Sequence, residues 1–305
     1  MALHLQLKFK ALKKRKLLYL FLSATFINVS FAQVNENLLM ERFNMNAFNP
    51  AYAGSEGRVL SFTTRSTWQG VSGAPKMNYF YLSGNPKKNL AFGLSIINNK
   101  VFIDERTLYS VDASYQLTVG AGKTLSLGIK AGAHTKFTDV EAIQRLTNAP
   151  NSAIPDITKE TYPVFGFGGL YKTQKFYVSF SIPNFLNPIK YTDNESFIGD
   201  EKPSTYLLAG YKIGGVGTVD SSINPFISSN IIPGIGNTLH FGGTYDYKGL
   251  IEVGGGYKST RYMNVMAIFK TKFGLSLAYA YDFRGASNDV EVQKSGNEIF
   301  LKFNF

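Results

Sequence analysis

The sequence predicts an all-β fold: a transmembrane antiparallel β-barrel of about 14 strands. Three observations predict it: an N-terminal segment typical of exported proteins, many short stretches in which apolar and polar residues alternate, and a chain that ends on an aromatic residue. Mean hydropathy is −0.07, aromatic residues make up 14%, charged residues only 17%, and there are 29 glycines. This composition suits a barrel whose outer wall is apolar and whose inner wall is small and polar.

Residues 1–32 are typical of a secretory signal peptide. Six Lys and Arg residues precede the apolar run Leu17–Ile27, and Ser30 and Ala32 place small residues before a cleavage point. A membrane-spanning helix needs about 20 apolar residues, so this run is too short to be one. The segment therefore predicts export of the chain, and with the barrel it predicts the outer membrane of a Gram-negative cell.

The net charge of +11 depends largely on the signal segment. Without its six basic residues the rest of the chain has 26 basic and 21 acidic residues, a net charge of +5. A nucleic-acid partner is therefore not predicted from the charge. The sequence contains no cysteine, which excludes a lipoprotein and a disulfide protein.

Residues 33–56 precede the first predicted strand. Within them, Glu36–Phe43 has Leu39 and Phe43 four residues apart, which favours a short amphipathic helix. Two interpretations stay open for this periplasmic segment: it caps or plugs the periplasmic mouth of the barrel, or it is a flexible leader.

Period-two alternation predicts fourteen strands within residues 57–305, an even number as single-chain bacterial barrels have. The predicted strands are 59–68, 77–83, 89–98, 107–117, 124–135, 163–171, 175–182, 204–213, 223–231, 238–247, 249–258, 263–270, 273–282 and 298–305.

Charged residues fall on one face of the strands. In 107–117, Tyr109, Val111 and Tyr115 alternate with Asp112 on the opposite face. The same separation places Lys130, His240, Asp246, Glu252 and Asp282 opposite an apolar stripe. Since a Lys or Arg on the lipid face near the bilayer centre costs about 2–4 kcal/mol, these residues should face the lumen. A soluble β-sandwich would alternate too, and it is the signal segment, the last residue and the loop pattern that favour the barrel.

Connection lengths also alternate. Turns such as Lys172–Gln174 are short, whereas 136–162, 183–203 and 283–297 are long. Short periplasmic turns and longer extracellular loops are typical of outer-membrane barrels. With the N-terminus in the periplasm, all three long loops are expected outside the cell.

The last predicted strand alternates Ile299, Leu301 and Phe303 with polar residues and ends on Phe305. A terminal Phe on such a strand resembles the signal that barrel-assembly machinery reads.

Catalytic chemistry is not predicted. The exported part of the chain has two histidines, His134 and His240, both expected to face inward. Asp246 lies six residues from His240 on the same face, roughly 20 Å away along a strand, so these two residues do not form a catalytic dyad. A cross-strand partner for His240 stays open. We therefore predict no enzyme and no cofactor.

Metal and phosphate sites are weakly indicated at most. Zinc would need clustered His or Cys ligands, and Cys is absent. The runs Gly214–Gly217 and Gly254–Gly256 lack the Lys-Ser/Thr and helix of a phosphate loop, so they favour turn and wall glycines. A calcium site in the loops stays open at the acids Asp104, Glu105, Asp139, Glu141, Asp193 and Glu195.

The run Phe48–Ser55, Phe-Asn-Pro-Ala-Tyr-Ala-Gly-Ser, resembles the N-terminal hallmark of the PorP/SprF family of type IX secretion system barrels from Bacteroidetes. Asn297 stands where that family more often has His. Other segments resemble the family in order: Arg65–Gly70, Gly73–Pro75, Pro163–Gly168, Phe176–Asn184 and Gly296–Ile299.

The resemblance implies a role in secreting cargo proteins such as adhesins or attaching them to the cell surface, in connection with gliding. It implies cargo at the extracellular loops and contact with periplasmic motor, ring or peptidoglycan-associated subunits. The barrel wall itself contacts outer-membrane lipid. The alternative function is a passive outer-membrane porin or solute channel.

The hallmark run supplies the predicted partner-binding residues: Phe48, Asn49, Pro50, Tyr52 and Gly54. Pro50 biases Asn49 toward extended backbone, Gly54 permits positive φ, and Tyr suits an interface. Two roles stay open: docking a periplasmic partner, or shaping the entry into the first strand.

Overall fold

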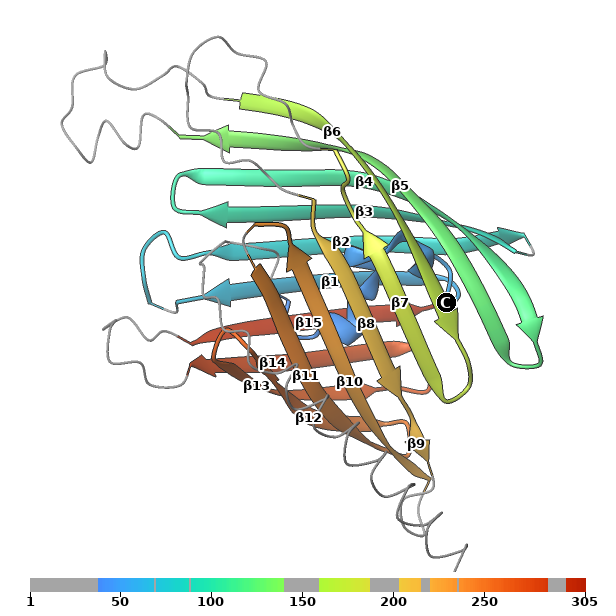
Figure 1. Cartoon of the computed structure of the whole chain (residues 1–305). Coiled ribbons are helices and arrows are strands. Elements are labelled where there is room, and N and C mark those ends of the chain that lie inside the picture. The colour runs from blue at the N-terminus through green and yellow to red at the C-terminus, as the bar shows by residue number, and fades with distance from the viewer. Residues whose placement is uncertain are drawn as a thin grey trace, which may run out of the picture. The chain divides into compact units, whose positions relative to one another are not determined.

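The chain forms a closed antiparallel β-barrel, seen here in a computed structural model (Figure 1). The structure describes residues 38–68, 70–87, 89–139, 159–186, 203–214, 220–234, 236–284 and 295–305. The predicted signal segment and most of the three predicted long loops lie outside these residues. No helix among them is long and apolar enough to cross a membrane.

Each strand pairs with its neighbour in sequence, and β1 pairs with β15 to close the ring. The strands are β1 (Val59–Thr67), β2 (Lys76–Lys87), β3 (Leu90–Val101), β4 (Asp104–Gly120), β5 (Lys123–Thr138), β6 (Lys159–Lys172), β7 (Phe176–Ile182), β8 (Thr205–Tyr211), β9 (Ile213–Gly214), β10 (Ser221–Ile232), β11 (Gly236–Tyr247), β12 (Ile251–Lys258), β13 (Tyr262–Lys270), β14 (Leu275–Arg284) and β15 (Gly296–Asn304).

The predicted count of fourteen strands is confirmed. The short β9 continues β8 past Lys212, and both pair with β10, so together they form one strand of the wall. Several strands are longer than predicted; β6 begins at Lys159 rather than at residue 163. Apolar and polar residues alternate only in the part of a strand that crosses the apolar band. Near its end a strand such as β6 has polar residues on both faces, so the alternation stops before the strand does.

The predicted faces are confirmed. Ile129 is 66% exposed on the outer wall, whereas its neighbour Lys130 is 2% exposed and faces the lumen. Asp112, on β4, lies directly across from Lys130 in the strand register. Glu252 and Asp282 are likewise buried on the inner side, so the outer wall is an apolar band suited to lipid.

The two ends of the barrel differ. At one end, the turn end, the wall turns tightly, as at Thr173–Phe176 and Thr271–Gly274. This end also holds the first residue of β1 and the last residue of β15. The connections β5–β6, β7–β8 and β14–β15, which contain the predicted long loops, leave the opposite end, the loop end.

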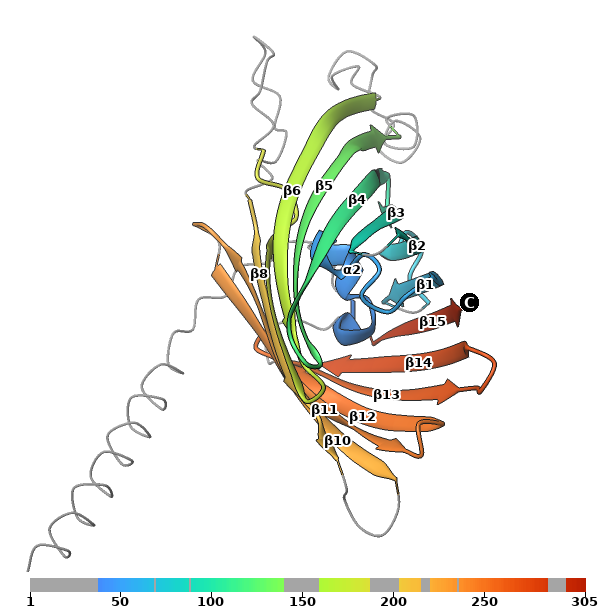
Figure 2. The same cartoon turned by 90° about the vertical axis from the view of Figure 1, so that its right-hand side faces the viewer.

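Residues 38–58, the luminal segment, lie inside the ring of strands (Figure 2). The segment contains the 3-10 turn η1 (Glu41–Phe43), the helix α2 (Met45–Phe48) and the 3-10 turn η2 (Pro50–Tyr52). The helix predicted at 36–43 is wrong in position, since residues 38–40 are not helical. A barrel carboxylate binds the backbone N–H groups of Leu39 and Met40 and fixes where the first turn begins.

Candidate functional site

Asn49 fastens the luminal segment to the wall formed by β6 and β7. Its side-chain amide donates to the carbonyl of Gly169 at 3.0 Å and to Ser179 Oγ at 2.8 Å, and its Oδ1 accepts from the N–H of Ala51 at 2.8 Å. The backbone of Asn49 is extended, as its position before Pro50 predicts. Because the side chain is 2% exposed, these bonds replace those that water would make.

Two wall glycines let the segment approach this closely. A Cβ on Gly168 would lie 2.1 Å from Asn49 Oδ1, and a Cβ on Gly128 would lie 2.3 Å from the backbone nitrogen of Ala51. Gly128 and Gly168 are direct partners in the pairing of β5 with β6. Any side chain at either position would push η2 away from the wall.

The neighbouring side chains of the hallmark run pack against the same wall. Phe48 lies against Tyr206 with ring centroids 4.7 Å apart, and its carbonyl accepts from Ser181 Oγ at 2.8 Å. Tyr52 is buried beside Leu170. This wall therefore holds the segment through both apolar contact and backbone hydrogen bonds.

Past η2 the segment turns down to the turn end of the barrel. Gly54 has φ +69°, which confirms the positive φ expected there. Lys172 Nζ donates to the carbonyl of Ser55 at 3.2 Å. Glu56 pairs with Lys302 of β15 at 2.9 Å, just before β1 begins.

The opposite wall holds the segment through charge. Glu41 Oε1 lies 2.7 Å from Lys258 Nζ, and Arg42 Nη1 lies 2.5 Å from Glu252 Oε1. Both partners belong to β12, six residues apart and therefore roughly 20 Å apart along the strand. Lys270 completes this group with its Nζ 2.6 Å from Glu252 Oε2. Two adjacent residues of the segment thus bind the two ends of one strand's luminal face.

Glu298 of β15 caps the start of the segment. Its Oε2 accepts from the N–H of Leu39 at 2.6 Å and its Oε1 from the N–H of Met40 at 3.2 Å. Arg65 of β1 lies 3.9 Å from Glu298 and 2.9 Å from Asp282. The carboxylate is fully buried, so these donors and the guanidinium are what offset its desolvation.

Two further charges, on β4 and β5, face the same segment. Lys130 Nζ lies 3.7 Å from Asp112 and 3.4 Å from the carbonyl of Ala47. Both side chains are almost fully buried. The segment thus supplies a backbone acceptor to a buried cation of the wall, whose other charged neighbour is Asp112.

Electrostatics favour the ionised form of Glu41. Burial alone would raise the pKa of Glu41, but Lys258 and His240 outweigh burial and hold that pKa well below its usual range. Glu41 therefore stays charged at neutral pH, and its attachment to β12 persists there.

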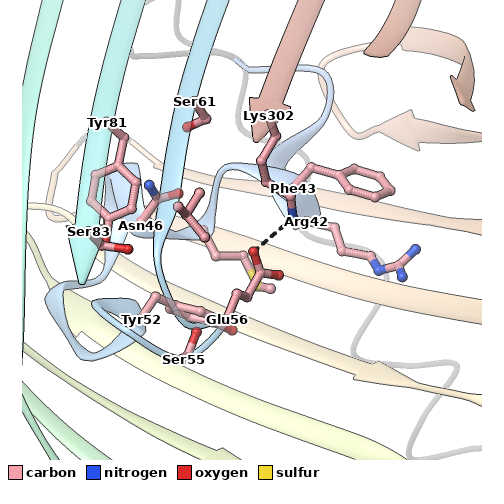
Figure 3. A pocket seen from close by; sticks show the side chains of 12 residues that line it. Arg42, Phe43, Asn46, Tyr52, Ser55, Glu56, Ser61, Tyr81, Ser83 and Lys302 are labelled. Carbon is pink, nitrogen blue, oxygen red and sulfur yellow. Dashed lines mark hydrogen bonds and ion pairs between the residues drawn. The ribbon is translucent and has the colours of Figure 1, made fainter. Parts of the chain in front are cut away.

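A small cavity lies between the segment and strands β1, β2 and β15 (Figure 3). Asn46, Tyr52, Glu56, Tyr81 and Lys302 are among its lining residues, and the Glu56–Lys302 ion pair lies within it. Its volume of about 20 Å³ is enough for about one water molecule. Small-molecule sites are roughly 300–1,000 Å³, so the cavity is no solute site.

All five predicted site residues lie in the lumen. The structure brings Phe48, Asn49, Pro50, Tyr52 and Gly54 together on the β4–β8 side, and each is buried. A partner that touches them directly would have to displace the segment, so partner binding by these residues stays a prediction. Sequence reasoning missed the charged anchors at Glu41 and Arg42, whose partners lie about 200 positions later in the chain.

The inward position predicted for the two histidines is confirmed, and His240 has a carboxylate neighbour on the luminal segment rather than on a strand. Its Nδ1 lies 3.3 Å from Glu41 Oε2, to which Ser228 Oγ donates at 2.5 Å. The carboxylate therefore sits between serine and imidazole, whereas a serine nucleophile needs the imidazole itself. Among the described residues, no three His, Cys, Asp or Glu side chains are grouped as metal ligands.

Comparisons with known proteins give a family and a fold. The family model described as type IX secretion system membrane protein PorP/SprF matches residues 34–303. No curated protein matches the sequence. The outer membrane protein Omp33 of Acinetobacter baumannii is a structural neighbour with TM-score 0.50 and 7% identity, over 82% of this chain and 98% of that chain. The toluene transporter TodX of P. putida has TM-score 0.50 and 10% identity, over 84% and 92%. Both likenesses show the fold, an outer-membrane barrel.

Proposed function

Because the chain belongs to the PorP/SprF family of type IX secretion system membrane proteins, we propose that this barrel is needed for the secretion or surface attachment of cargo proteins such as adhesins. The observation that carries the proposal is the extent of the family match, residues 34–303, which includes both the luminal segment and the strands. The chain acts in the outer membrane, where its apolar band faces lipid.

The luminal segment occupies the barrel interior, and this bears on how the barrel takes part in secretion. Ion pairs from Glu41 and Arg42, the cap at Glu298 and the Asn49 bonds hold the segment across the barrel from one wall to the other. We infer that the barrel is a membrane-held platform for other subunits, and that cargo crosses the membrane elsewhere. Cargo would meet the loop end, whose longest connections fall within residues 136–162, 183–203 and 283–297.

Periplasmic motor, ring or peptidoglycan-associated subunits are the proposed partners on the other side. The turn end is assigned to the periplasm, since short turns face that compartment in outer-membrane barrels. The passive porin is the competing function, and the contacts of the luminal segment argue against it.

Deleting the gene tests the proposal. We expect one or a few type IX cargo proteins to disappear from the cell surface, measured by surface proteomics, while uptake of small solutes stays normal. The opposite result, normal cargo display with a solute-uptake defect, would establish the porin function.

Planar-bilayer conductance of the purified protein separates the two functions independently. We expect low conductance from the intact chain and stepwise conductance from a variant that lacks residues 38–56. A large, steady conductance from the intact chain would contradict the platform.

A further inference from the structure

The turn end of the barrel is basic. Of the described residues there, seven are Lys or Arg that no acidic side chain binds within 4 Å: Arg58, Lys123, Lys172, Lys175, Lys212, Lys248 and Lys272. We call these seven residues the basic mouth. All but Lys172 are exposed.

Most acidic side chains at this end already form ion pairs. Glu56 is bound by Lys302, and Asp246 is bound by Lys270. Asp220 is exposed beside Lys248, whose N–H donates to its backbone carbonyl at 2.8 Å. One exposed aspartate and the terminal carboxylate therefore face seven cations among the described residues, and the surface keeps a clear positive excess.

The excess is densest where β6 and β8 end and β7 begins. The N–H of Lys212 donates to the carbonyl of Lys175 at 2.6 Å, so the two lysines are neighbours on adjacent strands. Lys172 begins the turn that leads to Lys175. Like charges this close repel one another, which costs stability unless an anion is bound there.

Lys212 is on the inner row of its strand. Tyr211 and Ile213 on either side are exposed on the outer wall, at 47% and 46%. Gly210 and Gly214, two residues to either side, pair with Phe226 and Ser222, which are buried on the luminal side. Since side chains alternate along a strand, Lys212 faces the mouth and not the surrounding lipid.

The opposite end has a smaller excess in its described part. Lys100 lies 3.9 Å from Glu105, and Asp104 accepts a hydrogen bond from Thr138. Four acidic side chains lie there among six basic ones: Asp104, Glu105, Asp139 and Glu160 among Lys76, Lys100, Arg106, Lys136, Lys159 and Arg261. Most of the luminal segment is buried or half-buried, and it is open at the turn end only at Glu56 and Arg58.

We propose that the basic mouth is a docking surface for an acidic face of a periplasmic protein, which seats end-on over the turn end. This inference rests on the proposed function, in which such subunits associate with the barrel. An end-on protein contacts both the inner row, with Lys212, and the outer rim. Anionic lipid headgroups would reach only outward groups such as Lys123 and Lys248, the latter lying over the Tyr247 ring at 5.3 Å.

The test replaces the lysine pair and compares it with matched sites. K175E/K212E reverses the pair, K175R/K212R keeps its charge, K123E/K248E reverses the outer rim, and K100E reverses an exposed lysine at the loop end. A photo-crosslinking residue at Gln174, exposed in the turn between β6 and β7, reports contact in native membranes. A heat-modifiable band on a denaturing gel shows that each variant is folded.

We expect crosslinks from Gln174 to Asp- and Glu-rich peptides of a periplasmic protein. K175E/K212E should lower that crosslink roughly tenfold, whereas K175R/K212R and K100E leave it unchanged. Reversing the crosslinked acids of the partner to Lys should restore the crosslink to K175E/K212E. Restoration identifies a direct charge contact that a folding defect does not produce.

Two results would overturn the inference. One is a crosslink that K175E/K212E leaves unchanged. The other is crosslinking to lipid alone, with only K123E/K248E altering retention on vesicles of phosphatidylglycerol relative to phosphatidylethanolamine. The proposed function fails separately. In that case the deletion strain displays type IX cargo normally, although the intact barrel in wild-type cells still crosslinks to the acidic partner.

Discussion

Asn49 and Gly168 are fitted to each other: a Cβ on Gly168 would lie 2.1 Å from Asn49 Oδ1, closer than non-bonded atoms approach. The asparagine belongs to the luminal segment and the glycine to the barrel wall. Their contact makes the hallmark run and the wall one structural unit, and it accounts for a glycine at position 168 of β6.

Replacing Gly168 should release the segment from the wall. We expect G168A to lower stability by about 1–3 kcal/mol, the usual cost of overpacking, or to displace η2. G169A is the matched control, because its Cβ would meet nothing closer than 3.8 Å. The thermal midpoint of the heat-modifiable band in detergent measures the difference. Equal midpoints for the two variants would contradict the proposed contact.

Substitutions in the hallmark run distinguish its two possible roles. N49A removes hydrogen bonds to Gly169, Ser179 and the Ala51 N–H, and the double variant with Y52A also removes buried ring contact. If the run is structural, we expect these variants to expose the segment to protease and lower the midpoint. Weaker partner co-purification from an equally stable barrel would instead support docking by these residues.

Acid should loosen the segment through Glu41. Lys258 and His240 hold its pKa below the ordinary value of 4.5, so its ionised form stabilises the folded state above that pH. This contribution falls as the pH drops below about 4.5 toward the lowered pKa. The stability difference between wild type and E41Q should therefore shrink in that range, as thermal midpoints from pH 7 to 3 will show. A difference that stays constant with pH would remove Glu41 as the cause.

Orientation in the membrane can be read from cysteine labelling, since the natural chain has no cysteine. Cysteines at Asn151 and Asn194, in the predicted long loops, should react with an impermeant maleimide on whole cells. One at Thr173, in a turn-end connection, should react only after the outer membrane is opened. The reverse pattern would invert the assignment of the two ends.

Sequence patterns predicted the wall well because its physics is local. Lipid on one side and a polar lumen on the other impose alternation that can be counted within one strand, and Asp112 and Lys130 fell on the correct face. Their pairing follows once the register of β4 and β5 is known. Strand ends such as Lys159 were less predictable, because alternation fades where the wall leaves the apolar band.

The position of the luminal segment could not be predicted from the sequence, because its contacts are long-range. In the sequence, Glu41 and Arg42 have the pattern of a solvated face of a short helix. Nothing near them indicates that they form ion pairs with Lys258 and Glu252. The family resemblance marked the run from Phe48 but not its location. Glycines at 128 and 168 were the available signal, since unexplained small residues on a luminal face indicate close backbone approach.

The cap on Glu298 also constrains how the protein is made. Leu39 stands near the N-terminal end of the described residues, yet the carboxylate that binds its N–H lies 259 positions later, in the last strand. The start of the segment therefore cannot take its final place until β15 has joined the barrel. Completion of the luminal packing is then coupled to the joining of β15 with β1, the same step that closes the ring of strands.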